Sequence, residues 1–359
     1  MPGANCQADD YKEIVHQVEV YHPGQIKDYE ATGKLVELHK LQGQTVEFYM
    51  DVESVICEDS LCKIVIVRIF WDRLGFYTRY ELAPGIQLEK AEGKPFTSDD
   101  HEKLHKILQQ TDSPFKELFL GELVSVEDGP DIVDGRSGAT IALSENASVK
   151  GAVWTCYTLW HWANGCIVPI IRQITAQACN LNDLMDYLKK GEENHKVFAM
   201  QELKNRGAYD GQSVEAVLNQ TTSEDLSFTK LALKYLEPAP SEIYYSSLNQ
   251  LFKEGNSKQR IMYLNSLLTT RQDPSPEYYM RFSQNLCDMK SYQEVDMLLN
   301  LFEREKFSSA ELNKQAICLL EGKDFLIARR AYWFLNNQTL TASQNEILEA
   351  FRLQYSEML

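Results

Sequence analysis

The sequence is short of positive charge and has no long apolar run. Its 359 residues include 36 Lys and Arg against 52 Asp and Glu, which gives a formal net charge of −16. Because an acidic surface repels phosphate backbones, DNA and RNA are not expected as partners. No apolar run approaches the roughly 20 residues that an α-helix needs to cross a bilayer. A transmembrane segment is therefore not expected either.

Several motifs that mark common chemistries are also missing. The eight cysteines are too sparse for a disulfide scaffold, and no CxxC motif indicates a zinc ribbon or an attached haem. The chain has no GxGxxG fingerprint, Walker loop or GxSxG elbow, so direct oxidation of NADH by this chain is not expected. Cys57 and Cys62 flank four residues beside an apolar run, where a hairpin disulfide and two separate thiols both stay open.

The N-terminal half mixes strand-like and helix-like patterns. A hydrophobic share of 44% and a charged share of 25% are ordinary for a folded soluble protein of two or three domains. Thr97 and Asp100 have the spacing of a capping box at the start of a helix over residues 97–110. β-branched and aromatic residues predict strands over 45–52, 63–71, 76–82 and 118–126, the middle two forming a hairpin.

A second helix is predicted over residues 144–163. Its apolar stripe consists of Val149, Val153, Cys156, Tyr157 and Trp160. Asn164 and Gly165 suggest a left-handed cap at its end.

From about residue 181 only helical periodicity remains. Helix pairs are expected to begin near residues 193, 223, 257, 291 and 324, a spacing of roughly 30 to 34 residues that is typical of helical repeats. This segment resembles HEAT-like or related α-solenoid repeats. We therefore predict an α+β domain over 1–180 and an all-α helical-repeat domain over 181–359.

The sharpest motif is Asp-Gly-Arg-Ser-Gly-Ala-Thr at residues 134–140. Gly135 and Gly138 allow tight turns and the close approach of a ligand. Thr140 precedes the predicted second helix, so a phosphate beside its hydroxyl would meet free N–H groups and a favourable helix dipole. On the residues alone, a small-residue loop that caps this helix is the alternative.

This heptapeptide resembles the pattern D-G-x-[ST]-G-A-T of FMN-binding domains of the covalently flavinylated type. The family includes the flavin-carrying subunits of sodium-pumping NADH:quinone reductases, in which a flavin transferase joins the FMN phosphate to the last Thr. The resemblance implies Thr140 as the attachment residue. It implies recognition by the transferase for Asp134, Ser137, Gly138 and Ala139. Arg136 either balances the phosphate charge or is a solvated loop residue.

Two further features bear on this resemblance. Ile141 departs from the small hydroxyl residue that many members carry after the motif. Residues 81–85, Glu-Leu-Ala-Pro-Gly, are similar to a Glu-Thr-Pro-Gly-like turn that the family places near the isoalloxazine. The aromatic residues after the motif either stack on a flavin or pack in the core; they are Trp154, Tyr157, Trp160, His161 and Trp162.

The resemblance implies an electron-transfer flavoprotein that exchanges electrons with partner redox proteins and is a carrier, not a self-sufficient oxidoreductase. Its helical-repeat domain would dock a protein partner. Because the transferase works outside the cytoplasm in this family, a periplasmic or cell-surface location in a bacterium is expected. Met1 to Cys6 show no secretory signal, so a cytoplasmic location stays open.

Two other functions compete with the flavoprotein. His101, Glu102 and His105 form an H-E-x-x-H motif on a predicted helix, the pattern of zinc hydrolases. The charged Lys103 inside the motif counts against zinc, and no third ligand is obvious, with Glu117 and Glu122 merely available. The second alternative is a helical-repeat interaction scaffold without covalent flavin.

Overall fold

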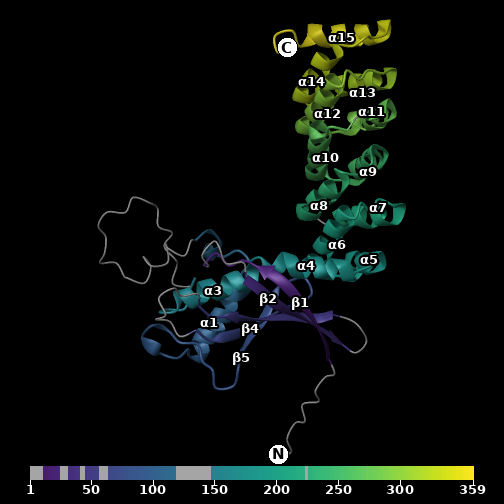
Figure 1. Cartoon of the computed structure of the whole chain (residues 1–359). Helices are drawn as coiled ribbons and strands as arrows, with labels where there is room; N and C mark the ends of the chain where they lie inside the picture. Colours follow the sequence, from purple (N-terminus) through teal and green to yellow (C-terminus); the bar gives the residue numbers. More distant parts are fainter. Residues whose placement is uncertain are drawn as a thin grey trace, which may run out of the picture. The chain divides into compact units, whose positions relative to one another are not determined.

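The chain forms two compact units, Met1–Cys179 and Asn180–Leu359. This is a computed structural model, and it describes residues 11–24, 31–40, 45–55, 64–118, 147–222, 225–272 and 274–359. Figure 1 shows strands in the N-terminal unit and helices throughout the C-terminal one. The expectation of an α+β region followed by an all-α region is therefore confirmed.

The N-terminal unit contains a five-stranded antiparallel meander in the order β1-β2-β3-β4-β5. The predicted hairpin is confirmed, and its turn is held by the Asp72 carboxylate, which accepts hydrogen bonds from the backbone N–H groups of Leu74 and Phe76. The first two strands of the meander were not predicted. The strands are β1 (Tyr11–Val20), β2 (Ala31–Lys40), β3 (Thr45–Glu53), β4 (Ile66–Trp71) and β5 (Tyr77–Leu82).

One face of this sheet packs against α1 (Ser98–Gln109) and α3 (Val153–Asn164). The inward side chains of the strands are fully buried at Leu35, Phe48 and Trp71. The Trp71 indole N–H donates to the Ala163 carbonyl at 2.7 Å, which fastens α3 to the sheet. The core of the unit therefore lies between the meander and these two helices.

The predicted capping box at the start of α1 is present. The Thr97 hydroxyl accepts from the Asp100 N–H, and the Asp100 carboxylate accepts from the Thr97 N–H. We expect Thr97→Ala to lower the free energy of unfolding of this unit by about 1 kcal/mol, because it leaves helix N–H groups unpaired. Urea unfolding followed by tryptophan fluorescence measures the loss, since four of the five tryptophans lie in this unit. Thr97→Ser keeps the acceptor, so an equal loss in that variant would contradict the explanation.

The predicted second helix is wrong at its start, whereas its predicted end at residue 163 is confirmed to within one residue. Residues 147–152 form turns, with Gly151 at φ +74°, and α3 starts only at Val153. Gly165 has φ −89°, so the left-handed cap is absent, and the chain turns at once into the unpredicted α4 (Ile167–Ala178). The helix therefore does not begin directly after Thr140, which itself lies outside the described residues.

The C-terminal unit consists of helices joined by short connections. The predicted pair starts lie within three residues of the starts of the even-numbered helices from α6 to α14. The helices are α5 (Leu181–Lys190), α6 (Glu193–Asn205), α7 (Gly211–Leu218), α8 (Leu226–Leu236), α9 (Ser241–Glu254), α10 (Ser257–Thr269), α11 (Pro276–Ser283), α12 (Tyr292–Arg304), α13 (Ala310–Leu320), α14 (Phe325–Leu335) and α15 (Ala342–Gln354).

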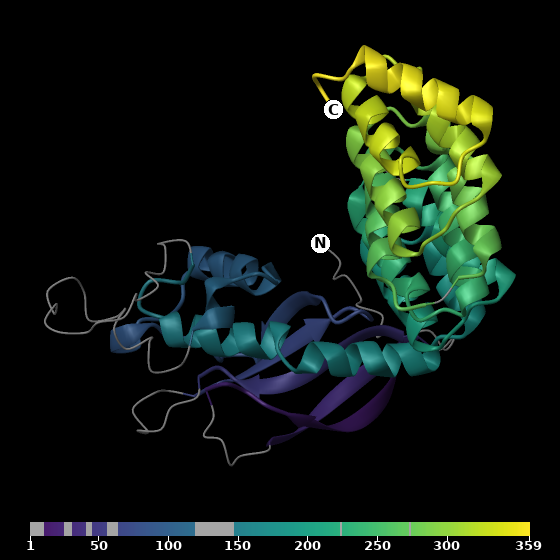
Figure 2. The same cartoon turned by 90° about the horizontal axis from the view of Figure 1, so that it is seen from above.

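These helices stack in two columns, which Figure 2 shows from above. Each even-numbered helix from α6 to α12 contacts the next even-numbered one, and each odd-numbered helix from α5 to α13 contacts the next odd-numbered one. Leu264, Leu299 and Phe302 are fully buried, as their helical spacing predicted. No single helix buries its apolar stripe alone, so the unit is stabilised by contacts between neighbours.

A buried guanidinium links two neighbouring helices of this unit. Arg330 on α14 is only 6% exposed, and it donates to Asp296 at 2.6 Å and to both carboxylate oxygens of Glu303 on α12. We expect Arg330→Ala to lower the free energy of unfolding by about 2–3 kcal/mol, because it leaves two carboxylates without their partner. Urea unfolding followed by far-ultraviolet circular dichroism measures this.

A matched control for this variant is Arg352→Ala. Arg352 is 54% exposed and pairs with Glu349 on the surface of α15. An exposed pair contributes about 0.5 kcal/mol or less, so the control should be close to wild type. Equal losses in the two variants would show that burial of the Arg330 cluster is not what stabilises the unit.

Candidate functional site

The heptapeptide that resembles a flavinylation motif lies outside the described residues. This applies to Asp134, Arg136, Ser137, Gly138, Ala139 and Thr140 alike. It also applies to Cys57 and Cys62, and to the predicted strand over 118–126 except Leu118. The structure does describe the residues on either side of the segment that carries the motif.

Both attachment points lie against the same turn of α3. Before the segment, the Leu118 carbonyl accepts a hydrogen bond from the Tyr157 hydroxyl at 3.3 Å. After it, the buried Val149 N–H donates to the Cys156 sulfur at 3.3 Å. Leu118 and Val149 are both buried, so the chain leaves and re-enters the described part of the unit at residues that pack in its core against α3.

An aromatic and imidazole cluster surrounds this turn. The His161 ring lies 4.4 Å from Tyr157 and 4.9 Å from Trp160, measured between ring centroids. His22, from the residues after β1, lies 4.8 Å from Trp162. Tyr157, Trp160 and Trp162 are all buried, so they belong to the core of the unit. Sequence reasoning identified the members on α3 but missed His22, which only the tertiary fold brings there.

The two histidines of this cluster are held in their neutral form. The Gly24 N–H donates to Nδ1 of His22, and Nε2 of His22 lies 3.0 Å from the Thr158 carbonyl. A ring with an acceptor at one nitrogen and a donor at the other is a neutral tautomer. Burial lowers the pKa of His22 to about 4. Burial also lowers the pKa of His161, whose Nε2 bonds to the Phe115 carbonyl, to about 4.

The H-E-x-x-H motif lies on α1, but its histidines bond to tyrosines of β5. Nδ1 of His101 is 2.5 Å from the Tyr80 hydroxyl, and Nδ1 of His105 is 3.0 Å from the Tyr77 hydroxyl. Glu102 points into solvent and pairs with Lys106, four residues on. Within the described residues no group of three His, Cys, Asp or Glu side chains could hold a metal ion. These contacts give the motif a packing role between α1 and β5.

The two carboxylates that the sequence offered as further ligands were Glu117 and Glu122. Glu117 is exposed at the end of a short helical turn, Pro114–Glu117, and Glu122 lies outside the described residues.

The turn at residues 81–85 forms as its sequence suggested. The Ile86 N–H donates to the Ala83 carbonyl at 3.0 Å, and Gly85 has φ +78°, a conformation that favours glycine after Pro84. A hollow of about 320 Å³ lies beside this turn, lined also by Arg68. The Arg68 guanidinium is bound to both oxygens of Asp51, so its charge is already balanced.

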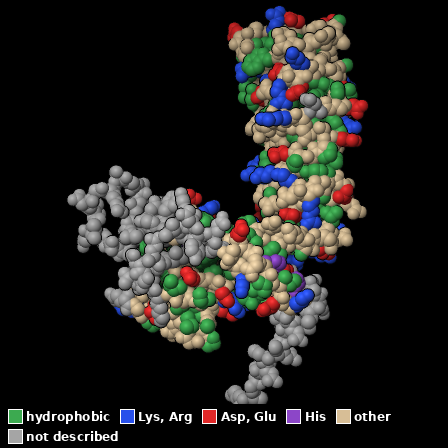
Figure 3. Space-filling model, viewed as in Figure 1, with side chains coloured by type: hydrophobic (Ala, Val, Ile, Leu, Met, Phe, Trp, Pro, Cys, Tyr) green, Lys and Arg blue, Asp and Glu red, His purple; other side chains and the backbone are tan. Residues whose placement is uncertain are grey.

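One hollow of the C-terminal unit lies among its first four helices. It has a volume of about 750 Å³, and Leu188, Ala216 and Phe228 are its buried apolar residues. Lys189, Lys196 and several side-chain amides provide polar groups. On the face drawn in Figure 3, acidic and basic side chains of this unit are interspersed, without the continuous basic patch that a nucleic acid needs.

No helix in the described ranges is long and apolar enough to span a bilayer. Comparison with family models, with curated proteins and with solved structures gives no match for this chain.

Proposed function

We propose that the chain is an electron-transfer flavoprotein that carries FMN joined through its phosphate to the Thr140 hydroxyl. The observation that carries this proposal is the heptapeptide Asp-Gly-Arg-Ser-Gly-Ala-Thr at residues 134–140. A threonine hydroxyl is the group that a phosphoester needs, and small residues before it leave room for a transferase. The bound flavin would supply the one- or two-electron chemistry, while the protein sets its surroundings.

The described structure supports this proposal through the place where the segment is attached. Leu118 and Val149 are buried and bond to consecutive residues of α3, so the segment that carries the motif is attached at both ends to a packed α+β core. Neutral His22 and His161 put no positive charge into that core at pH 7, since burial lowers the pKa of each to about 4. The segment that would carry the redox group therefore begins and ends at a packed core without positive charge from these two rings.

For the C-terminal unit, the proposal is an α-solenoid of HEAT-like repeats that docks a protein partner. The successive contacts within each column of helices and the spacing of the helix starts support it. The hollow among α5, α6, α7 and α8 offers space for a partner segment. The partners would be the redox proteins that give electrons to the flavin or take them from it.

A periplasmic or cell-surface location is part of the same proposal. Flavin transferases of this type act outside the cytoplasm. The disulfide between Cys287 and Cys318 supports the location independently, because disulfides persist in oxidising compartments and are rare in the cytosol.

The test is to produce the chain together with a flavin transferase and to measure its mass after denaturation. The proposal expects an increase equal to FMN less one water, on the peptide that contains Thr140, and flavin fluorescence that stays with the denatured band. Bare polypeptide would overturn it and leave the second candidate, an interaction scaffold without flavin. The stacked helices of residues 181–359 favour that candidate next. Stoichiometric zinc that disappears in His105→Ala would instead support the hydrolase.

A further inference from the structure

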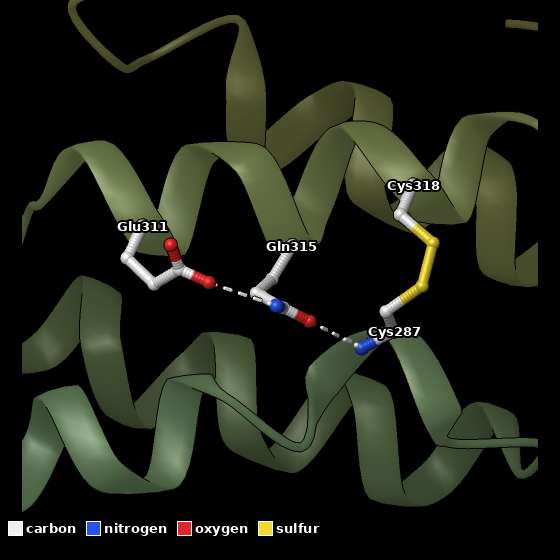
Figure 4. The surroundings of a disulfide bond; sticks show 4 residues. All are labelled: Cys287, Glu311, Gln315 and Cys318. Carbon is white, nitrogen blue, oxygen red and sulfur yellow. Dashed lines mark hydrogen bonds between the residues drawn. A yellow bond between two sulfur atoms is a disulfide. The ribbon is translucent and has the colours of Figure 1, made fainter.

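One disulfide crosses between separate elements of the C-terminal unit. Cys287 lies in a short helical turn, Leu286–Asp288, that connects α11 to α12, and Cys318 lies in the last turn of α13. Their Cα atoms are 5.7 Å apart across a sequence separation of 31 residues. Figure 4 shows the bridge reaching from one element to the other. The bridge therefore ties the α11–α12 connection to the next helix pair.

A polar contact joins the same two elements one turn away. The Cys287 N–H donates to the Gln315 side-chain carbonyl at 3.3 Å, and the Gln315 amide donates to Glu311 at 2.9 Å (Figure 4). This contact keeps Cys287 next to α13 in a way that does not depend on the sulfur–sulfur bond. The two sulfurs should therefore stay close to each other when the bond is open.

Both cysteines line a hollow of about 610 Å³ on the surface of the unit. Both residues are partly exposed, whereas Cys156 and Cys179 are buried. The hollow is also lined by Lys290, Lys323 and several acidic residues. A small thiol can therefore reach the bridge while the helices remain folded.

We infer that Cys287 and Cys318 form a thiol–disulfide exchange site for small thiols of the glutathione or dithiol class. A thiolate of the reductant attacks the Cys318 sulfur, the Cys287–Cys318 bond breaks, and Cys287 leaves as a thiolate that takes up a proton. A second thiol then attacks the mixed disulfide on Cys318. This frees Cys318 as a thiol and leaves the reductant as its disulfide.

The direction of attack follows from the position of the two sulfurs. A thiolate on Cys318 would lie at the negative end of α13, which disfavours it. A thiolate on Cys287 lies off that helix end, and the hollow that both sulfurs line balances Lys290 and Lys323 against acidic residues, so the helix end alone distinguishes the two sulfurs. Because the better-stabilised thiolate leaves faster, Cys287 is the leaving group.

Opening the site should loosen one part of the stack only. In the described stack, α13 contacts α11, α14, α15 and the turn that carries Cys287, but not α6 or α8. Exchange at this site thus changes how firmly the last helix pairs are held, while the first pairs keep their contacts.

The test uses the full chain, oxidised first with oxidised glutathione. The chain is then exposed to dithiothreitol in native buffer, pulsed with iodoacetamide and mapped by mass spectrometry. The inference expects labelling of Cys287 and Cys318 at a rate that rises with thiol concentration and does not change with urea below the unfolding transition. Labelling that follows global unfolding would overturn it, and so would failure to form the linked peptide under oxidising conditions.

Two further measurements test the details. After brief exposure to reduced glutathione and an acid quench, the adduct is expected on Cys318, and an adduct on Cys287 would overturn the assigned direction. Amide hydrogen exchange in α13 should rise by about tenfold or more on reduction, with α6 unchanged. In the variant with both Cys287→Ser and Cys318→Ser, amide hydrogen exchange in α13 should not change when thiol is added. A change in that variant would overturn the inference.

Discussion

The Thr140→Ala variant is expected to carry no flavin when it is produced beside a flavin transferase, whereas the wild-type chain carries FMN. The physical reason is that alanine has no hydroxyl, so no phosphoester can form at that position. The measurement compares the intact mass and the in-gel flavin fluorescence of the two denatured proteins. Circular dichroism checks that the variant keeps the fold of the wild-type chain.

A matched pair of variants separates the anchor from the surrounding residues. Thr140→Ser keeps a hydroxyl and is expected to retain flavin at lower yield. Ser137→Ala removes a hydroxyl from the recognition sequence and leaves the anchor in place, so it should slow attachment without abolishing it. Full flavin in Thr140→Ala would show that another residue is the anchor.

Acid should destabilise the N-terminal unit strongly between pH 6.5 and 4. His22 and His161 each have an ordinary pKa of 6.5, and burial lowers it to about 4 in the folded chain. Below pH 6.5 the unfolded chain therefore binds protons that the folded chain does not, so the free energy of unfolding falls as the pH falls. At pH 5 the loss is about 2 kcal/mol per histidine and about 4 kcal/mol for both, and above pH 6.5 this contribution to pH dependence vanishes.

Urea unfolding followed by tryptophan fluorescence at pH 7, 6 and 5 measures this dependence. The slope between pH 6.5 and 5 should shrink by about half in His22→Gln. The contribution of the two histidines to this slope should disappear in the double variant with His161→Gln. The readout is the slope, since a lower stability at pH 7 in these core variants has no bearing on it. A wild-type chain equally stable at pH 7 and 5 would contradict the neutral, buried state of the two rings.

Local sequence patterns were sufficient for the C-terminal half. Each helix there has its own apolar stripe and often its own cap, such as Asp225 before α8, Asn256 before α10 and Asp324 before α14. Stacking joins each helix to near neighbours in the chain. The periodicity within about 30 residues therefore contained most of the information that the fold needs.

The first two strands escaped prediction because their inward face is partly polar. Glu37 is 4% exposed on the core side of β2, where it lies opposite Phe48, and its carboxylate meets His16 at 2.8 Å. A buried charge with its partner on the neighbouring strand blurs the alternation of apolar and polar residues that marks a strand. Its pairing exists only once β1 and β2 are side by side.

By itself the sequence determined the two-part division, most of the helices and the motif at residues 134–140. The tertiary structure alone decided the meeting of residues that lie far apart in the chain: His22 with Trp162 on α3, and Cys287 with Cys318 across 31 residues. It also gave His101 and His105 tyrosine partners on β5. Helix formation is governed by neighbours within a few positions, whereas contacts between elements depend on how whole helices and strands pack.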